Sequence, residues 1–351
     1  MPSRPKRQHY VTRAYLEGFL ESARPFLFCY GRQRGKPFQG QPSELAHERS
    51  YYSFRRPDGS WDDSLEHKIE QQVEGPGLDA MGVLAAGHTR LDWSERDALA
   101  MLMAVQRFRV PHIREMLDAA HAGTIEELLN EYDRMQKERG PGRLWIRNVR
   151  PVPGGGVQEG PHTYVTREDL EEFQRSLSQD PGQFSRESIF GLAGDFANLF
   201  RRMKWTVHYS NGKTPFITSD CPVLLRHERE DIEHAGIIRP DSHIEFPLSR
   251  TALLSLSHNI GLMNLLDRTK GDRERRRILS RLPEIRIEEA DEEQVRGFNL
   301  HQAQYCSRWV FCGQENDWLV ELLRQQSRNV RQRIVRDGEF IKFESLTGLS
   351  A

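Results

Sequence analysis

A run of strand-like segments between residues 203 and 257 constrains the fold of this chain more than any other feature. Residues 205–209 and 215–218 are rich in aromatic and β-branched side chains and flank Asn211-Gly212, the dipeptide most typical of a tight β-hairpin. Further strands are predicted at 244–247, 253–256 and 308–312. Because helical periodicity dominates elsewhere, we expect an α+β fold, with helices packed on a mostly antiparallel central sheet.

The chain has 351 residues, which exceeds one average domain without requiring two. We expect a single domain over 1–351. If it is subdivided, residues 1–139 form a mainly helical N-terminal part and residues 166–351 a sheet-containing C-terminal part. Residues 140–165 are predicted to be a loop or linker, because they are rich in Gly, Pro, Arg and Val with three glycines at their centre.

Charge and motifs exclude several classes of protein. The 50 basic and 51 acidic residues nearly cancel, which argues against wrapping nucleic acid by bulk charge. The chain lacks a long uncharged apolar run, so we expect a cytoplasmic protein without a membrane partner. The four cysteines lack the paired spacing of a zinc site, and the sequence contains no nucleotide-cofactor motif. The sequence does not decide whether a divalent metal is a cofactor, and it does not indicate an oligomeric state.

The segment QHYVTRAYLEGF, beginning at Gln8, predicts a short helix with Thr12 as its N-cap. His9 and Tyr10 would lie just before the helix, close to its free backbone N–H groups. A helix N-terminus disfavours a charged imidazolium, so His9 is expected to be neutral. His9 then either packs structurally or serves as a proton acceptor or anion contact.

Carboxylates recur along the helix predicted after residue 62. Glu66, Glu70 and Glu74 are spaced at i, i+4 and i+8 and fall on one line. Such a line is either a solvated face or a functional face, since metal-dependent hydrolases cluster carboxylates in this way.

Two further segments contribute polar side chains. Gln106 and Arg109 lie along an apolar helical ridge, where an arginine must find an anionic or carbonyl partner. Arg109 is either a buried ion-pair partner of Glu70, Glu74 or Asp220, or a clamp for a phosphate. Asp220 follows Ser219 at a predicted strand end, where it either faces a crevice or forms an Asx-type turn.

Four motifs carry a resemblance to a known family. Residues 8–19 resemble the QHYVPxxYLxxF start of a bacterial family called domain of unknown function 4238, and residues 106–111, 218–222 and 246–249 are similar to its other signatures in the same order. The resemblance covers nearly the whole chain but implies no activity. Thr12 stands where the family usually has proline, and both residues suit a helix start.

These observations give two functional hypotheses. The first is a hydrolase, for example a nuclease, acting on a phosphate-bearing small molecule or nucleic acid. Its catalytic groups would be His9, Asp220, Glu70 and Glu74, and its substrate-binding groups Gln106, Arg109, Tyr10 and Ser219. The second is a non-catalytic module that binds a protein or nucleic-acid partner, with the same residues forming a buried polar network. An open pocket would favour the first hypothesis, and full burial of Arg109 against a carboxylate the second.

Overall fold

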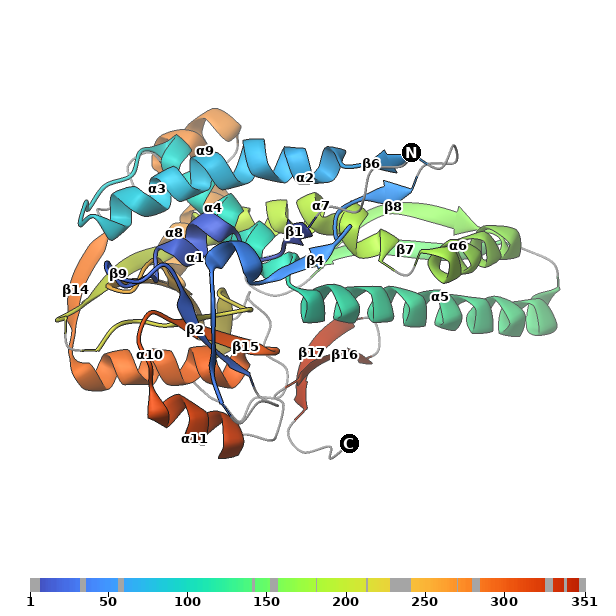
Figure 1. Ribbon diagram of the computed structural model, residues 1–351. Coiled ribbons are helices and arrows are strands. Elements are labelled where there is room, and N and C mark those ends of the chain that lie inside the picture. Colours follow the sequence, from blue (N-terminus) through green and yellow to red (C-terminus); the bar gives the residue numbers. More distant parts are fainter. Residues whose placement is uncertain are drawn as a thin grey trace.

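The structure is a computed structural model. It describes residues 7–31, 36–55, 60–140, 143–151, 157–180, 182–212, 214–227, 241–269, 271–279, 285–325, 331–337 and 340–346. The fold is α+β, with helices packed against several mostly antiparallel sheets. Figure 1 shows α3, α4 and α7 above these sheets and α10 and α11 below them.

A five-stranded sheet forms the centre of the molecule. Its strand order is β11-β12-β13-β9-β14, and only the β9–β14 pair is parallel. The strands are β9 (Lys204–Ser210), β11 (Leu224–His227), β12 (Ser242–Pro247), β13 (Ala252–Ser257) and β14 (Arg286–Ala290). Alternate residues such as Val207, Phe246 and Leu254 are buried in the main core, because successive side chains of a strand point to opposite faces.

The strand pairing in a second sheet contradicts two predictions about the central sheet. Its order is β10-β15-β2-β3, formed by β2 (Leu27–Gly31), β3 (Phe38–Gly40), β10 (Thr218–Ser219) and β15 (Trp309–Cys312). The hairpin predicted across Asn211-Gly212 is wrong, because β9 pairs with β13 and β14 while β10 pairs with β15. The strand expected at 308–312 is present but lies beside β2. Gly212 does adopt a positive φ of 91°, so the turn signal was local and did not specify pairing.

Long helices cover the apolar face of the central sheet. The longer helices of the body are α3 (Gly75–Ala85), α4 (Trp93–Phe108), α5 (Pro111–Arg139), α7 (Gln183–Phe200) and α10 (Glu292–Tyr305), and the shorter α11 (Asp317–Gln325) packs on β2 of the second sheet. Arg96 of α4 stacks on Trp205 of β9 at 4.3 Å, and the Trp205 indole donates to the carbonyl of Phe200 at the end of α7. Helices α4 and α7 therefore hold β9, an inner strand of the sheet, by directed contacts as well as by apolar burial.

Residues expected to be a loop form a β-hairpin instead. Strands β7 (Leu144–Pro151) and β8 (Val157–Val165) are antiparallel, while the glycines at 154–156 lie outside the described residues. With the far half of α5 and with α6 (Arg167–Gln179), the hairpin builds an arm that projects from the body (Figure 1). Ile125, Val165 and Leu170 belong to a small core of its own. The Gly/Pro-rich composition gave no strand signal here, and strand propensity depends strongly on what a strand packs against.

Short elements surround the N-terminus. Strand β1 (Arg7–His9) pairs with β4 (His47–Arg49), and α1 (Arg13–Glu17) follows it directly. Helix α2 (Ser64–Ile69) passes through a π-helical stretch, η2 (Glu70–Glu74), into α3. The remaining elements are η1 (Pro42–Glu44), β5 (Phe54–Arg55), β6 (Trp61–Asp62), α8 (Ile260–Arg268), α9 (Asp272–Leu279), β16 (Arg331–Asp337) and β17 (Phe340–Leu346). None of the helices in the described ranges combines the length and apolar character needed to cross a bilayer.

Candidate functional site

Arg109 lies at the centre of the largest buried polar network among the predicted site residues. Its side chain has no exposed surface and forms an ion pair with Glu74. One terminal nitrogen, Nη2, donates to Thr12 Oγ1 and Gln106 Oε1, and Nε donates to Gln106 Oε1 at 3.0 Å. Burial alone would lower the pKa of Arg109, but the Glu74 carboxylate raises it above its ordinary value. The guanidinium is therefore charged, and each of its nitrogens has a partner inside the protein.

Gln106 and Tyr10 extend this network. Gln106 is 2% exposed, and its Nε2 donates to the Tyr10 carbonyl at 2.8 Å. The prediction that the ridge carries Gln106 and Arg109 into apolar surroundings is confirmed by their burial. Tyr10 is itself buried, and burial together with the Asp220 charge raises the pKa of its hydroxyl. It is thus a neutral packing residue in this arrangement.

The predicted line of glutamates is split by the π-helical stretch. Glu74 faces inward, where it pairs with Arg109 and accepts a hydrogen bond from Thr12 Oγ1 at 2.9 Å. Glu70 is exposed and does not join the Arg109 network. A π-helical stretch holds more residues per turn than an α-helix, so residues spaced by four no longer stay on one line through it. Glu66 and Glu74 therefore bind partners inside the protein while Glu70 faces the solvent.

His9 lies in β1, directly opposite His47 of β4 in the antiparallel register. The two rings meet edge to face at a centroid distance of 5.6 Å. Burial and the neighbouring His47 lower the pKa of His9, and a hydrogen bond to the Ser43 backbone opposes this shift. His9 is neutral as expected, but through burial and His47 rather than through a helix N-terminus. Its Nε2 atom and Nδ1 of His47 are both buried without a hydrogen-bond partner.

Asp220 and Ser219 belong to a different part of the core. Asp220 is 2% exposed and accepts backbone hydrogen bonds from Ser307 at 2.8 Å, Arg308 at 2.6 Å and Trp309 at 3.2 Å. Burial raises the pKa of Asp220 to about 6, while these N–H groups oppose the rise. Ser219 Oγ donates to Gln302 at 2.9 Å. Asp220 ties the end of β10 to the segment entering β15, Ser219 ties β10 to α10, and neither has a hydrogen bond or ion pair with His9 or Arg109.

The geometry can now be compared with known proteins. Residues 7–316 match the family described as "Protein of unknown function (DUF4238)". The chain belongs to the DUF4238 family. No curated protein and no solved structure matches it.

The four motifs of this DUF4238 chain meet at the β1–α1 segment. Tyr15 of the first motif shares a 2.8 Å hydrogen bond with Thr218 of the third and donates to the Pro247 carbonyl of the fourth at 2.8 Å. The Tyr15 ring also stacks on Phe246, with 5.3 Å between centroids. The second motif joins through Gln106, as described above. Segments up to 232 residues apart are therefore joined by side chains of the first motif.

A neighbouring polar cluster was missed by the sequence analysis. Gln8 is fully buried, and its amide donates to Ser53 Oγ at 3.0 Å and Glu66 Oε2 at 2.9 Å, while its Oε1 accepts from the Tyr52 N–H at 2.6 Å. Ser53 Oγ in turn donates to Asp63 at 2.6 Å. No pattern in the sequence indicated this cluster, because its members come from three separate short elements. It holds β1 against α2 in the DUF4238 fold.

Cys221 contacts a histidine but is not activated by it. Its Sγ lies 3.2 Å from Nδ1 of His112, the pairing that a nucleophilic cysteine would use. However, burial and the adjacent Asp220 carboxylate raise the pKa of the Cys221 thiol well above its ordinary value. Burial also lowers the pKa of His112 to about 3. Both groups are neutral, and the pair packs as a thiol against an imidazole.

The site can therefore be described by what remains chemically available. Within the described ranges, no group of three or more His, Cys, Asp and Glu side chains is arranged to hold a metal ion. The guanidinium of Arg109 and the carboxylate of Asp220 are occupied by protein partners. Among the predicted catalytic residues, Glu70 is exposed to solvent and His9 keeps a free lone pair or proton on its buried Nε2.

Proposed function

We propose that this DUF4238 protein is a non-catalytic binding module whose motif residues form a buried scaffold for a partner-binding exterior. The observation that carries the proposal is the complete occupation of Arg109, which is fully buried and bound to Glu74, Thr12 and Gln106. An anion clamp needs donors that are free to bind a ligand. The partner is a protein or a nucleic acid segment, recognised by exposed residues outside the four motifs.

Stability measurements test this proposal. A scaffold arginine should be required for folding stability, because its removal leaves Glu74 partly buried without its cation. A ligand-binding arginine should be dispensable for stability, since functional sites are not optimised for folding. Thermal unfolding of Arg109→Ala, measured without any ligand, therefore separates the two cases. An unchanged melting temperature would contradict the binding-module proposal.

A hydrolase acting on a phosphate-bearing substrate is the second candidate, and the histidine pair favours it. Nε2 of His9 is buried without a partner while its ring is held through a hydrogen bond to the Ser43 backbone, and a hydrogen bond of this kind fixes the tautomer of a catalytic imidazole. The charges of Arg109 and Glu74 also act on this ring. The hydrolase would use His9 as general base, with the Ser43 backbone orienting its ring.

An activity panel decides between the candidates. Wild type and His9→Ala should be assayed with phosphomonoester, phosphodiester and single-stranded nucleic acid substrates, with and without divalent metal. Turnover that is lost in His9→Ala, at an unchanged melting temperature, would replace the binding-module proposal by the hydrolase. If the two proteins give the same background rates throughout, the histidine pair has a packing role.

A further inference from the structure

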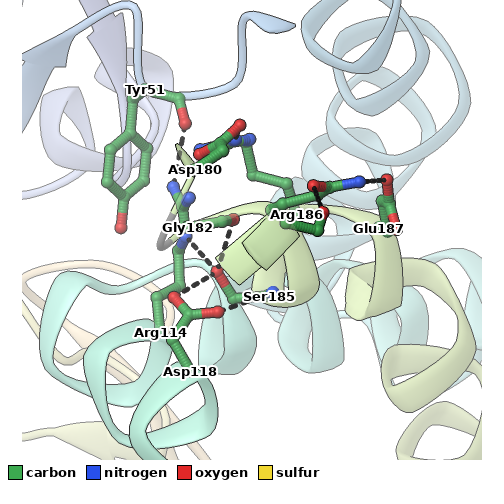
Figure 2. A network of polar contacts seen from close by, with 10 residues as sticks. Tyr51, Arg114, Asp118, Asp180, Gly182, Ser185, Arg186 and Glu187 are labelled. Atoms are coloured by element: carbon green, nitrogen blue, oxygen red, sulfur yellow. Dashed lines mark hydrogen bonds and ion pairs between the residues drawn. The ribbon is translucent and has the colours of Figure 1, made fainter. Parts of the chain in front are cut away.

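Two buried arginines converge where α5 and α7 begin, away from the four motifs. Arg114 lies in the first turn of α5 and Arg186 in the first turn of α7. They are 6% and 9% exposed. Figure 2 shows both side chains close to Gly182, which caps the N-terminus of the 18-residue helix α7. Arginines are rarely buried to this degree unless their N–H donors have hydrogen-bond partners.

In each guanidinium group, some nitrogens have hydrogen-bond partners and others have none among the described residues. Arg114 donates from Nε to Ser185 Oγ at 3.1 Å and from Nη1 to the Tyr51 carbonyl at 2.9 Å, and its side chain also acts on the Tyr51 hydroxyl. Within the described residues, no hydrogen bond joins its Nη2 to a carboxylate. Arg186 pairs through Nη2 with Asp180, and its Nε and Nη1 have no partner. Nε of Arg186 is sealed from solvent, whereas Nη1 of Arg186 and Nη2 of Arg114 are not.

The unpaired nitrogens of both arginines lie beside Gly182. A Cβ atom built on Gly182 would lie 2.7 Å from Nη1 of Arg186 and 3.3 Å from Nη2 of Arg114. Aromatic rings support both planes, since Arg114 lies 4.0 Å from the Tyr51 ring centroid and Arg186 lies 4.9 Å from that of Phe54. Two like charges fixed side by side repel each other unless anions balance them. Asp180 pairs with Arg186 and the charge of Asp118 acts on both arginines, so carboxylates already balance part of this repulsion. The geometry is therefore preorganised for an anion rather than for another cation or an apolar group.

We infer that Arg114 and Arg186 form a binding site for a phosphoryl group at the N-terminus of α7. A phosphate carries about 1.5 to 2 negative charges at pH 7 and offers several acceptor oxygens. It can accept from both guanidinium groups at once, and the positive end of the helix dipole adds to the attraction. Sequence analysis placed anion recognition at Arg109, whereas the free donors lie here.

Two carboxylates next to the arginines should lower the affinity of the proposed site for phosphate. Removing one of them should therefore change phosphate binding in a direction that can be predicted. Asp118 accepts from the Ser185 N–H at 2.9 Å and from its hydroxyl at 2.9 Å, so it occupies part of the helix terminus. Burial raises the pKa of Asp118, while the Ser185 hydrogen bonds and the charges of Arg114 and Arg186 oppose the rise. Asp180 is 41% exposed and holds Arg186 from the solvent side. An incoming phosphate must compete with Asp180 for Arg186, so removing that carboxylate should strengthen binding.

Calorimetric titration of the full chain with inorganic phosphate tests the site, with chloride at matched ionic strength as the reference. Arg186→Gln should weaken phosphate binding about tenfold or more, because a charge-assisted hydrogen bond is lost. Asp180→Asn should tighten it. The matched control is Arg175→Gln, which removes an exposed arginine of α6 and should leave the affinity unchanged. Titration with adenosine 5′-monophosphate tells whether the site takes a phosphate ester as well as the free ion.

A second variant protects the test against misfolding. Arg114 also holds Tyr51 and Ser185, so its loss could unfold the protein. Gly182→Ala keeps both charges but places a methyl group against Nη1 of Arg186, and it should likewise weaken phosphate binding. No saturable binding of phosphate by wild type, or wild-type affinity in both Arg186→Gln and Gly182→Ala, would overturn the inference. This test does not depend on the binding-module proposal, whose measurement is made without ligand.

Discussion

Replacing Arg109 by alanine should destabilise the protein strongly. The side chain has no exposed surface, and its three nitrogens bind Glu74, Thr12 and Gln106. After truncation, the Glu74 carboxylate keeps only the Thr12 hydroxyl as a donor, and Gln106 Oε1 is left without a hydrogen bond. The fold would then carry an uncompensated charge, an unpaired acceptor and a cavity in the same place.

The structure sets the size of the effect. Removing one partner of a buried ion pair costs about 3–5 kcal/mol. The Glu74 side chain is 18% exposed, so water can solvate it partly, and the lower end, about 3 kcal/mol, is expected. The entropy of unfolding is about 2.1 cal/mol/K per residue, which for 351 residues converts this loss into a melting temperature lower by about 4 °C.

Thermal and urea unfolding followed by circular dichroism measure the effect. Arg134→Ala is the matched control, because Arg134 is 66% exposed and pairs only with Glu131. The double variant Arg109→Met with Glu74→Leu should recover most of the stability, since replacing both partners of a buried pair by apolar residues is often neutral. If Arg109→Ala unfolds within about 0.5 kcal/mol of wild type, as surface substitutions do, the scaffold role is refuted.

Three further predictions use other parts of the molecule. His112 binds a proton near pH 6.5 when unfolded but only near pH 3 when folded, so stability is present above pH 6.5 and is lost as the pH falls toward 3. The loss from pH 6.5 to 5 should be about 1–2 kcal/mol, and His112→Gln should flatten it in pH-dependent urea titrations. All four cysteines are buried and should react with a thiol reagent only after unfolding. Gly77→Ala should destabilise, because its Cβ would lie 2.5 Å from Leu102 Cβ, whereas Gly82→Ala in the same helix meets nothing within 4 Å and should stabilise by about 0.5–1 kcal/mol.

Local signals in the sequence predicted elements but not their partners. Thr12 was expected to begin a helix, and α1 does begin after it, yet its hydroxyl bonds Glu74 and Arg109 instead of capping. Gly212 turns as predicted, but β9 pairs with strands other than the next one. Pairing depends on which surfaces the rest of the chain offers, and short-range propensity does not contain that information.

The sequence named residues that do take part in the buried network, but it did not give their arrangement in space. Burial of Arg109 could be expected from the apolar ridge, because an arginine there must be paired. Arg109 pairs with Glu74 and not with Glu70 because of the π-helical stretch, and no spacing rule predicts such a stretch from the sequence. Arg114 and Arg186 were missed for a simpler reason. They come from the first turns of two helices about seventy residues apart along the chain, and only tertiary packing brings them to Gly182.

Tyr51 joins the buried scaffold to the proposed phosphate site, and its two functions can be separated. Its hydroxyl donates to the Arg109 carbonyl at 2.7 Å, while its own carbonyl and ring hold Arg114. Tyr51→Phe removes only the first contact and leaves a buried carbonyl at the end of α4 unpaired, which should cost about 1–3 kcal/mol in urea unfolding. The ring and backbone that support Arg114 remain, so phosphate affinity should stay within about twofold of wild type. A stable Tyr51→Phe protein that no longer binds phosphate would mean that the hydroxyl, and not the pair of arginines, recognises the anion.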